Sequence, residues 1–570
     1  MKLRAAGRCS RISVFVVCLL CPIDAPGQPR FAKTDTRVPM SDGTQLASDL
    51  YLPESGAPFP TIVIRTPYGK DQMKVFAEFF ATNGYAVVVQ DVRGKWASEG
   101  EIVPFVDEQQ DGVETLDWIV EQEWSNGDIG MWGSSYLSYC ALTVAEAQHP
   151  ALKTIFSNSG WLNGDKINSP GGALHWMLML PWTLHEATLK TRSLQNYDLD
   201  ELFRHVPLKD VMASVGINDP VWENPDTLSV MDVYDCSDIK IPIFHLTGWY
   251  DFVHPSALFV YETVRAATSH PQRLLVGPWV HDQLWTPYTQ VGDQDLGDES
   301  VMGIEQLNGL ALTWFDHWLK GAGDEVMTEP PIKLFVLGEN KWHTFEEWPP
   351  RNVSYEPWFL TSGGNANTRH GDGELIAKPS DETPGLDTFV FDPMDPVPTT
   401  GGANFHFFPD RLGIRDQREV EDRDDVLVYT SAPVTEELLV IGPVTAVIHV
   451  STDGKDTDFT AKLVEIREDG YAANIVEGII RASFRNSRDQ ADLLEPGRIY
   501  ELKIDLGATA LAIKPNHRIR LEISSSNFPK YDRNPNTGEH PWTAVEYRAA
   551  KQTVYHGSEH PSRVVLPVVK

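Results

Sequence analysis

The stretch Asp128-Ile-Gly-Met-Trp-Gly-Ser-Ser-Tyr-Leu-Ser138, followed by a helical run from Tyr139 to Gln148, decides the fold. A short apolar strand runs into a turn bounded by glycine, and apolar residues at helical spacing follow the turn at once. A strand, a tight turn and a helix in this order expose a serine hydroxyl, as in a nucleophile elbow. The stretch therefore predicts one strand-to-helix step of an α/β sheet, with a candidate catalytic residue at its edge.

Segments on both sides alternate between short β-branched runs and stretches with apolar residues at helical spacing. The β-branched runs are 60–65, 85–90, 241–247 and 273–277, and the helical stretches are 107–123 and one near 256–268. Alternation of this kind predicts a parallel sheet with helices on both faces.

Changes in hydrophobic pattern and composition divide the chain into five segments. We predict a signal segment over 1–27, an α/β core in two parts over 28–160 and 241–350, a helical insertion over 161–240 and a β-sandwich over 351–570. The insertion has helical periodicity over 174–193 and 199–213 and would lie over the carboxyl edge of the sheet as a lid. After residue 350 short alternating strands replace the helical pattern, which is typical of a sandwich.

The N-terminus has the pattern of a secretory signal. Basic residues precede an apolar run over 12–20, and Ala25 and Gly27 offer small side chains for cleavage. A lipid on Cys21 is the alternative, although Leu20 is larger than lipoprotein processing sites tolerate. The apolar run is too short to span a bilayer, and no later stretch reaches the roughly 18 apolar residues needed. We therefore expect a periplasmic or extracellular protein.

Composition narrows the class of partner. With 42% hydrophobic and 22% charged residues, the 570-residue chain resembles an ordinary globular enzyme rather than a disordered one. Acidic residues number 80 against 48 basic ones, a net charge of −32, which would repel phosphate backbones and anionic membranes. Nucleic acid is excluded as the expected partner, a small molecule is favoured, and the oligomeric state stays open, a homodimer included.

Only two cysteines, Cys140 and Cys236, lie outside the predicted signal segment. One disulfide between them or two buried thiols are both compatible with the sequence, and the apolar helical pattern around Cys140 favours buried thiols.

Ser135 is the candidate nucleophile at the predicted turn. A serine hydroxyl attacks poorly until a base removes its proton, and the tight turn exposes the hydroxyl to such a base. The register counted from Gly133 favours Ser135 over Ser134. Leu137 stands where the usual Gly-x-Ser-x-Gly pattern has its second glycine.

Asp251 and His281 are the candidate partners, because each follows the end of a predicted strand. The order Ser, Asp, His is that of α/β-hydrolases, and open α/β sheets place their sites at these strand ends. His281 would accept the serine proton, and Asp251 would fix the imidazole tautomer. A turn-forming aspartate and a structural histidine are the alternative interpretations, and His254 and Asp282 are the rival partners.

The oxyanion donors are expected to be the backbone N–H of Tyr136 and a group from the loop after an early strand. Tyr68, in Arg65-Thr-Pro-Tyr68, occupies that loop, where it could also be a packed aromatic residue. Three tryptophans of the insertion could line an acyl pocket or form the insertion's own core. These are Trp161, Trp176 and Trp182.

Five motifs together resemble the cocaine esterase-like group of α/β-hydrolases, which is related to Xaa-Pro dipeptidyl-peptidases. They are Arg65-Thr-Pro-Tyr68, Gln90-Asp-Val-Arg-Gly94, Trp132-Gly-Ser-Ser-Tyr136, Gly248-Trp-Tyr-Asp251 and Gly277-Pro-Trp-Val-His281. The resemblance continues through the β region, from about residue 34 to residue 570. It implies an α/β-hydrolase domain, a helical cap insertion and a C-terminal jelly roll of the galactose-binding-like kind.

The resemblance also implies the catalytic triad Ser135, Asp251 and His281, with Tyr68 and the Tyr136 backbone as the oxyanion hole. We therefore expect a serine hydrolase that cleaves carboxylic esters through an acyl-enzyme, without metal or cofactor. An amidase or dipeptidyl-peptidase of the same fold is the alternative, and an inactive carbohydrate-binding protein is the rival. Val253 and His254 replace the acidic pair by which related amino-acid ester hydrolases hold an ammonium group.

Overall fold

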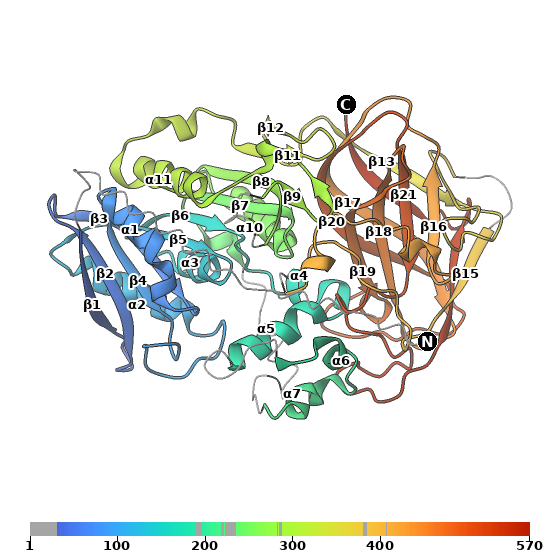
Figure 1. The fold of residues 1–570 in the computed structure, drawn as a ribbon, viewed down its shortest axis with the longest axis horizontal. Helices are drawn as coiled ribbons and strands as arrows, with labels where there is room; N and C mark the ends of the chain where they lie inside the picture. The colour runs from blue at the N-terminus through green and yellow to red at the C-terminus, as the bar shows by residue number, and fades with distance from the viewer. Residues whose placement is uncertain are drawn as a thin grey trace, which may run out of the picture.

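The computed structural model describes residues 31–188, 196–217, 222, 235–281, 283, 288–379, 385–405 and 407–570. An α/β region and an all-β region lie side by side, with a group of short helices beside both (Figure 1). The predicted signal segment 1–27, the end of the predicted helix 174–193 and the rival residue Asp282 lie outside the described residues.

A ten-stranded sheet forms the α/β region, in the order β1-β2-β4-β3-β5-β6-β7-β8-β11-β12. The strands are β1 Phe31–Pro39, β2 Gln45–Pro53, β3 Phe59–Thr66, β4 Ala86–Asp91, β5 Ser125–Ser134, β6 Leu152–Asn158, β7 Ile243–Tyr250, β8 Gln272–Val280, β11 Ile332–Val336 and β12 Lys341–Phe345. The strands from β4 to β11 pair in parallel, whereas β1, β2 and β12 are antiparallel edges. The sequence patterns predicted β3, β4, β5, β7 and β8, and missed β6, β11 and these edges.

Helices cover both faces of this sheet, as the alternating pattern predicted. On one face pack α1 Lys74–Thr82 and α11 Ile304–Lys320; on the other pack α2 Glu108–Val120, α3 Tyr136–Glu146 and α10 His254–Ala267. Successive residues of a strand point to opposite faces, so Ile62 joins the first core and Val63 the second. Cys140 and Cys236 form no disulfide with each other, and both are buried in the second core.

Short helices occupy the segment between β6 and β7: α4 Asp165–Asn168, α5 Trp176–Thr188, α6 Leu199–Phe203 and α7 Val211–Ser214. The predicted continuous helix over 199–213 is wrong. Pro207 interrupts it, because proline has no N–H to donate and pushes the preceding residue out of the helical region. A 3-10 turn, η4 Leu208–Asp210, follows the proline before α7 begins.

The C-terminal region is all β apart from short 3-10 turns in its described part. Its eleven-stranded sheet runs β15-β22-β17-β23-β13-β14-β16-β21-β18-β19, and β20 also pairs with β17. The strands are β13 Val353–Thr361, β14 Glu374–Ile376, β15 Gly385–Phe391, β16 Leu427–Ser431, β17 Leu438–Thr452, β18 Asp458–Ile466, β19 Ala472–Arg481, β20 Tyr500–Ile513, β21 Arg518–Ser524, β22 Ala550–His556 and β23 Arg563–Val569. The face of β20 packs against β19, which brings distant parts of the sheet together around one core.

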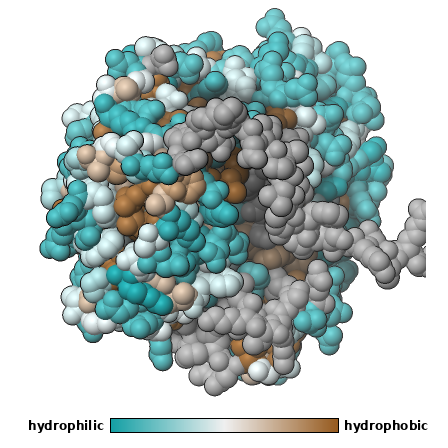
Figure 2. Space-filling view, turned by 60° about the vertical axis from the view of Figure 1, so that its left-hand side comes forward, coloured by the Kyte–Doolittle hydropathy of each residue, from teal (hydrophilic) through white to brown (hydrophobic). Residues whose placement is uncertain are grey.

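The same apolar core continues from the β region into the edge of the α/β sheet. It includes β11 residues, and Leu337 just after β11 exchanges backbone hydrogen bonds with Ala510 and Ala512 of β20. The surface seen from the α/β side is mainly hydrophilic, with hydrophobic residues gathered in smaller patches (Figure 2). No helix in the described part of the chain is both long and apolar enough to cross a membrane.

Candidate active site

Ser135 lies between the end of β5 and the start of α3, in a strained turn. Its backbone has φ 56° and ψ −122°, a left-handed conformation that residues other than glycine rarely adopt. A Cβ atom on Gly133 would lie 2.3 Å from the carbonyl carbon of Leu137, so only glycine allows α3 to start this close to β5. Leu137 itself is 3% exposed and packs into the core that contains Trp132.

His281 lies between Ser135 and Asp251 and contacts each through a different ring nitrogen. Its Nε2 is 3.0 Å from Ser135 Oγ, and its Nδ1 is 2.8 Å from Asp251 Oδ1. Asp251 directly follows β7 and His281 directly follows β8, so adjacent parallel strands deliver both side chains to one edge of the sheet. An imidazole held in this way can receive a proton at Nε2 while a carboxylate fixes the tautomer.

The Asp251 carboxylate is 1% exposed and has two further hydrogen bonds. Ser159 Oγ donates to Oδ2 at 2.6 Å, and the Val253 N–H donates to Oδ1 at 3.0 Å. These donors hold the carboxylate in place beside the imidazole. The sequence analysis missed Ser159, whose only signal was its position after β6.

The rival residues make other contacts. Ser134 Oγ accepts a hydrogen bond from Asn158 Nδ2 at 3.0 Å. His254 is buried at the start of α10 against the Trp249 ring, and burial lowers its pKa to about 4. Of the two serines, Ser135 is the one whose hydroxyl contacts the His281 imidazole.

A second cluster of Ser, His and Asp side chains lies in the β region. Its geometry differs from that of Ser135, His281 and Asp251. Ser362 Oγ lies 2.9 Å from His556 Nε2, and Asp387 Oδ2 lies 3.2 Å from the same nitrogen. Ser362 also donates directly to Asp387 at 2.7 Å. Because one nitrogen faces both partners, this histidine cannot pass a proton between opposite sides of its ring.

Tyr136 is held rigidly next to the Ser135 turn. Its hydroxyl donates to Glu108 and accepts a hydrogen bond from the Phe105 N–H at 3.1 Å. Glu108 is 3% exposed, and burial raises its pKa; burial also raises the pKa of Tyr136 well above its ordinary value, so the phenol stays protonated. These contacts fix the residue whose backbone N–H is the candidate oxyanion donor.

Tyr68 is half-buried, and its ring lies edge-on to Tyr136 at 6.4 Å between centroids. It borders the same cavity as Ser135. The structure therefore brings Tyr68, Tyr136 and Ser135 together at one cavity, and their role as an oxyanion hole stays a prediction.

The cavity beside Ser135 is small, about 50 Å³, and mainly apolar. Its walls are Tyr68, Phe105, Tyr136, Trp161, Ile167, Asn168, Leu178, Met179, Trp182, Phe252 and Phe405. Trp161 and Trp182 thus lie where the sequence placed an acyl pocket. Phe105, Phe252 and Phe405 were missed, and Phe405 comes from the C-terminal region, which no local pattern could connect to this site.

Trp176 does not line the cavity beside Ser135, although the sequence offered it as a pocket residue. It is fully buried, its Nε1 donates to the Phe203 carbonyl, and its ring packs on Trp222 in a separate core. Because α5 turns it away from the cavity that Trp182 borders, Trp176 belongs to the insertion's own core. Among the described residues, no group of three or more His, Cys, Asp or Glu side chains is placed to hold a metal ion.

Comparison with known proteins agrees with this geometry. Residues 42–283 match the X-Pro dipeptidyl-peptidase (S15 family) model, and residues 324–565 match the X-Pro dipeptidyl-peptidase C-terminal non-catalytic domain. The chain is 36% identical to the cocaine esterase of Rhodococcus sp. (strain MB1 Bresler), over 94% of this chain and 98% of that protein. The chain belongs to the S15 family.

Solved structures support the S15 fold over the whole chain. An α-amino acid ester hydrolase matches with a TM-score of 0.81 and 25% identity, covering 98% of this chain and 100% of that one. An aminopeptidase from a marine sediment archaeon, Thaumarchaeota archaeon, matches with a TM-score of 0.82 and 23% identity, covering 98% and 99%. These relatives show that the chain is a serine ester hydrolase. It has an α/β-hydrolase-like fold and a C-terminal all-β domain.

Proposed function

We propose that this chain is a secreted acyl esterase that uses Ser135, His281 and Asp251 as a catalytic triad. The observation that carries the proposal is the imidazole of His281, which contacts the serine hydroxyl and the carboxylate through opposite nitrogens. The predicted signal over 1–27 motivates the secreted location, either periplasmic or extracellular.

The chemistry proceeds in two halves. Ser135 Oγ attacks the ester carbonyl carbon while His281 Nε2 takes the hydroxyl proton, and Asp251 stabilises the imidazolium. The Tyr136 N–H and the Tyr68 hydroxyl donate to the oxyanion of the tetrahedral intermediate. The C–O bond to the alcohol breaks as His281 returns the proton to that oxygen. Water, activated by the same imidazole, then hydrolyses the acyl-enzyme and frees Ser135.

The walls of the small cavity favour a compact, apolar acyl group. Phe105, Trp161, Trp182 and Phe405 surround it with aromatic rings, and an uncharged acyl group loses little hydration there. Val253 and His254 leave no carboxylate where related hydrolases hold an amino-acid ammonium group. An ester with an unsubstituted acyl group is therefore the preferred substrate.

Peptidase activity is the second candidate function. The matching family model describes X-Pro dipeptidyl-peptidases, and the same triad chemistry cleaves amides. The helical segment 161–240 would act as a cap, since Leu178, Met179 and Trp182 of α5 border the cavity. The C-terminal strands would form a jelly roll that supports the site through Phe405.

The test is hydrolysis of p-nitrophenyl esters from acetyl to benzoyl, with Ala-Pro p-nitroanilide added for the peptidase. Ser135→Ala should lower kcat by about 10⁴-fold or more, since loss of a nucleophile removes the covalent route. Ser134→Ala is the matched control and should keep most activity. Comparable turnover by Ser135→Ala and the unaltered protein would reject the proposal.

A further inference from the structure

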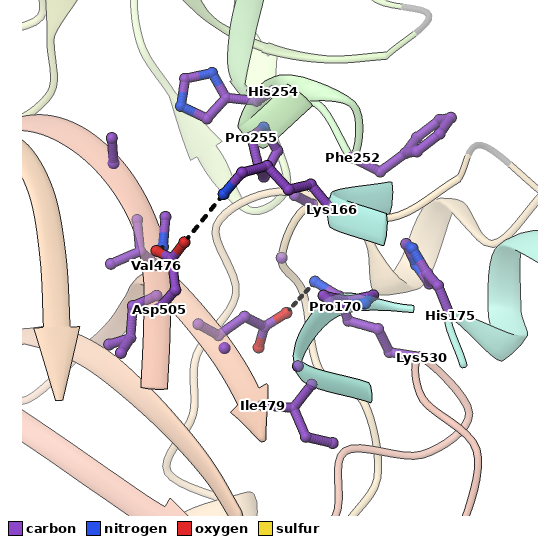
Figure 3. A pocket seen from close by; sticks show the side chains of 18 of the residues that line it. Lys166, Pro170, His175, Phe252, His254, Pro255, Val476, Ile479, Asp505 and Lys530 are labelled. Atoms are coloured by element: carbon purple, nitrogen blue, oxygen red, sulfur yellow. Dashed lines mark hydrogen bonds and ion pairs between the residues drawn. The ribbon is translucent and has the colours of Figure 1, made fainter. Parts of the chain in front are cut away.

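A second cavity, much larger than the one beside Ser135, lies where three parts of the chain meet. Its volume is about 370 Å³, against about 50 Å³ at Ser135, and it therefore has the size of a small-molecule site. Residues 249–255, from the end of β7 to the start of α10, the segment around α4 and strands β19 and β20 form its walls (Figure 3).

Phe252 is the wall that the two cavities share. Its side chain borders both, and it directly follows Asp251. The ring packs 4.5 Å from the His281 ring and 5.2 Å from the Phe405 ring, measured between centroids. Phe252 therefore stands between the small cavity and the large one.

The position of His281 tells which part of an ester this second cavity would face. In the proposed mechanism His281 Nε2 hands its proton to the departing alcohol oxygen, so the alcohol lies on the imidazole side of Ser135. Phe252 packs on that imidazole, whereas the rings of Phe105 and Trp161 stack toward Tyr136 and Tyr139 on the α3 side. The larger cavity is thus on the leaving-group side.

We infer that this cavity is the alcohol subsite, and that it takes bulky, uncharged alcohol groups that carry a hydrogen-bond donor. The inference rests on the proposed esterase function and adds the class of leaving group. An ester substrate has two parts, and the cavity beside Ser135 has room for only a small one.

Paired charges on the walls favour an uncharged ligand. Lys166 lies 3.4 Å from Asp505, Lys530 lies 2.7 Å from Glu477, and Arg488 lies 3.7 Å from Asp165 (the first two pairs are dashed in Figure 3). Lys503, the remaining lysine of the wall, is exposed to solvent. Each of these three cations, of which Lys530 is buried, thus already faces a carboxylate, and a charged ligand would have to displace one.

Aromatic and aliphatic side chains supply flat apolar surface for such a ligand. Trp249, Tyr531 and Ile479 border the cavity, and each is at least nine-tenths buried. Burying an apolar ring against them stabilises a complex in proportion to the apolar area removed from water. This surface favours an alcohol built on a ring over a short aliphatic one.

His175 provides an unused hydrogen-bond acceptor on the wall beside Phe252 (Figure 3). Its Nδ1 lies 3.0 Å from the Ile167 carbonyl and must donate to it, because a carbonyl can only accept. Burial lowers the pKa of His175 to about 3, so the ring is neutral and Nε2 keeps a lone pair. Nε2 has no hydrogen-bond partner among the residues that the structure describes, and a hydroxyl on the ligand would supply one.

The test compares acetate esters of three alcohols: methanol, 2-naphthalenemethanol and 6-hydroxy-2-naphthalenemethanol. Ala403→Trp fills the cavity from its wall and should lower the ratio of kcat/KM for naphthylmethyl over methyl acetate at least tenfold. Ala549→Trp, at an exposed position that does not border this cavity, is the matched control and should leave the ratio unchanged. Lys503→Trp repeats the test at an exposed wall position should Ala403→Trp destabilise the fold.

His175→Phe tests the donor requirement. It should reduce the preference for the hydroxylated over the plain naphthylmethyl ester by about three- to tenfold, the usual value of one hydrogen bond. An unchanged naphthylmethyl-to-methyl ratio in folded Ala403→Trp and Lys503→Trp would overturn the subsite, while methyl acetate turnover lost in Ser135→Ala would still support the esterase. No turnover of any ester by the unaltered protein would overturn both.

Discussion

Gly133→Ala should disable the enzyme without touching any polar group of the site. The added Cβ would lie 2.3 Å and 2.4 Å from the carbonyl carbon and oxygen of Leu137 and 2.4 Å from the Ser138 nitrogen. All three atoms belong to the backbone of α3 and cannot rotate away, so the first turn of the helix must move by about 1 Å to restore van der Waals contact. Overpacking of this kind costs about 1–3 kcal/mol of stability.

The same shift displaces Ser135, which lies between Gly133 and α3. A misplacement of about 1 Å at a reacting group costs about 100-fold in rate, so kcat for p-nitrophenyl acetate should fall by about that factor. Urea unfolding measures the stability loss, and steady-state kinetics measures the rate.

Gly309→Ala is the control for the substitution itself. Gly309 lies inside α11, and nothing stands within 4 Å of the Cβ that alanine would add. Alanine should stabilise that helix by about 0.5–1 kcal/mol and leave kcat unchanged. Full activity in Gly133→Ala, with the fold intact, would refute the claim that close approach of α3 to β5 positions the nucleophile.

Three more outcomes follow from the structure. Asp251→Asn should lower kcat by about 10⁴-fold, because an amide can hold the wrong imidazole tautomer; a loss below tenfold in steady-state kinetics would contradict this. Tyr136→Phe should lower kcat at least tenfold, since its phenol anchors the oxyanion residue to Glu108. Tyr85→Phe removes a buried phenol that donates to Asp316 on the other face of the sheet, and it should change stability alone. Burial raises the pKa of Glu522 from 4.5 to about 8, so the stability that its protonated form contributes is complete below about pH 4.5 and is lost as pH rises through 8. Urea titrations should show this decline between pH 5 and pH 8, and Glu522→Gln should flatten it; an equal slope in both proteins would refute the assignment.

The sequence predicted the polar centre of the site because that centre depends on strand ends. The carboxyl ends of parallel strands meet at one edge of a sheet, so residues that directly follow β5, β7 and β8 must approach one another. Ser135, Asp251 and His281 occupy these positions, and each has a residue type suited to its place in the chain of hydrogen bonds. Distance along the sequence does not matter to this argument.

The apolar walls of the site could not be predicted in the same way. Trp176 and Trp182 lie on one helix and look alike in sequence, yet one faces the insertion's core and the other faces the cavity. Phe405 reaches the site from a loop of the C-terminal region. Which aromatic residue borders a cavity depends on how separate segments dock, and hydrophobic periodicity carries no information about docking.

Three residues with strained backbones lie at the site. Phe105, Ser135 and Ser159 have φ angles of 70°, 56° and 48°, and they lie in the loops that follow β4, β5 and β6. Each one delivers a group to the site: the Phe105 N–H to Tyr136, the Ser135 hydroxyl to His281, and the Ser159 hydroxyl to Asp251. Left-handed conformations at such residues cost about 1–3 kcal/mol each, and the surrounding fold must offset that cost. Three consecutive loops share this strain at the one edge where the polar groups converge, which is expected if the precise placement of those groups, rather than maximal stability, shaped this edge of the sheet.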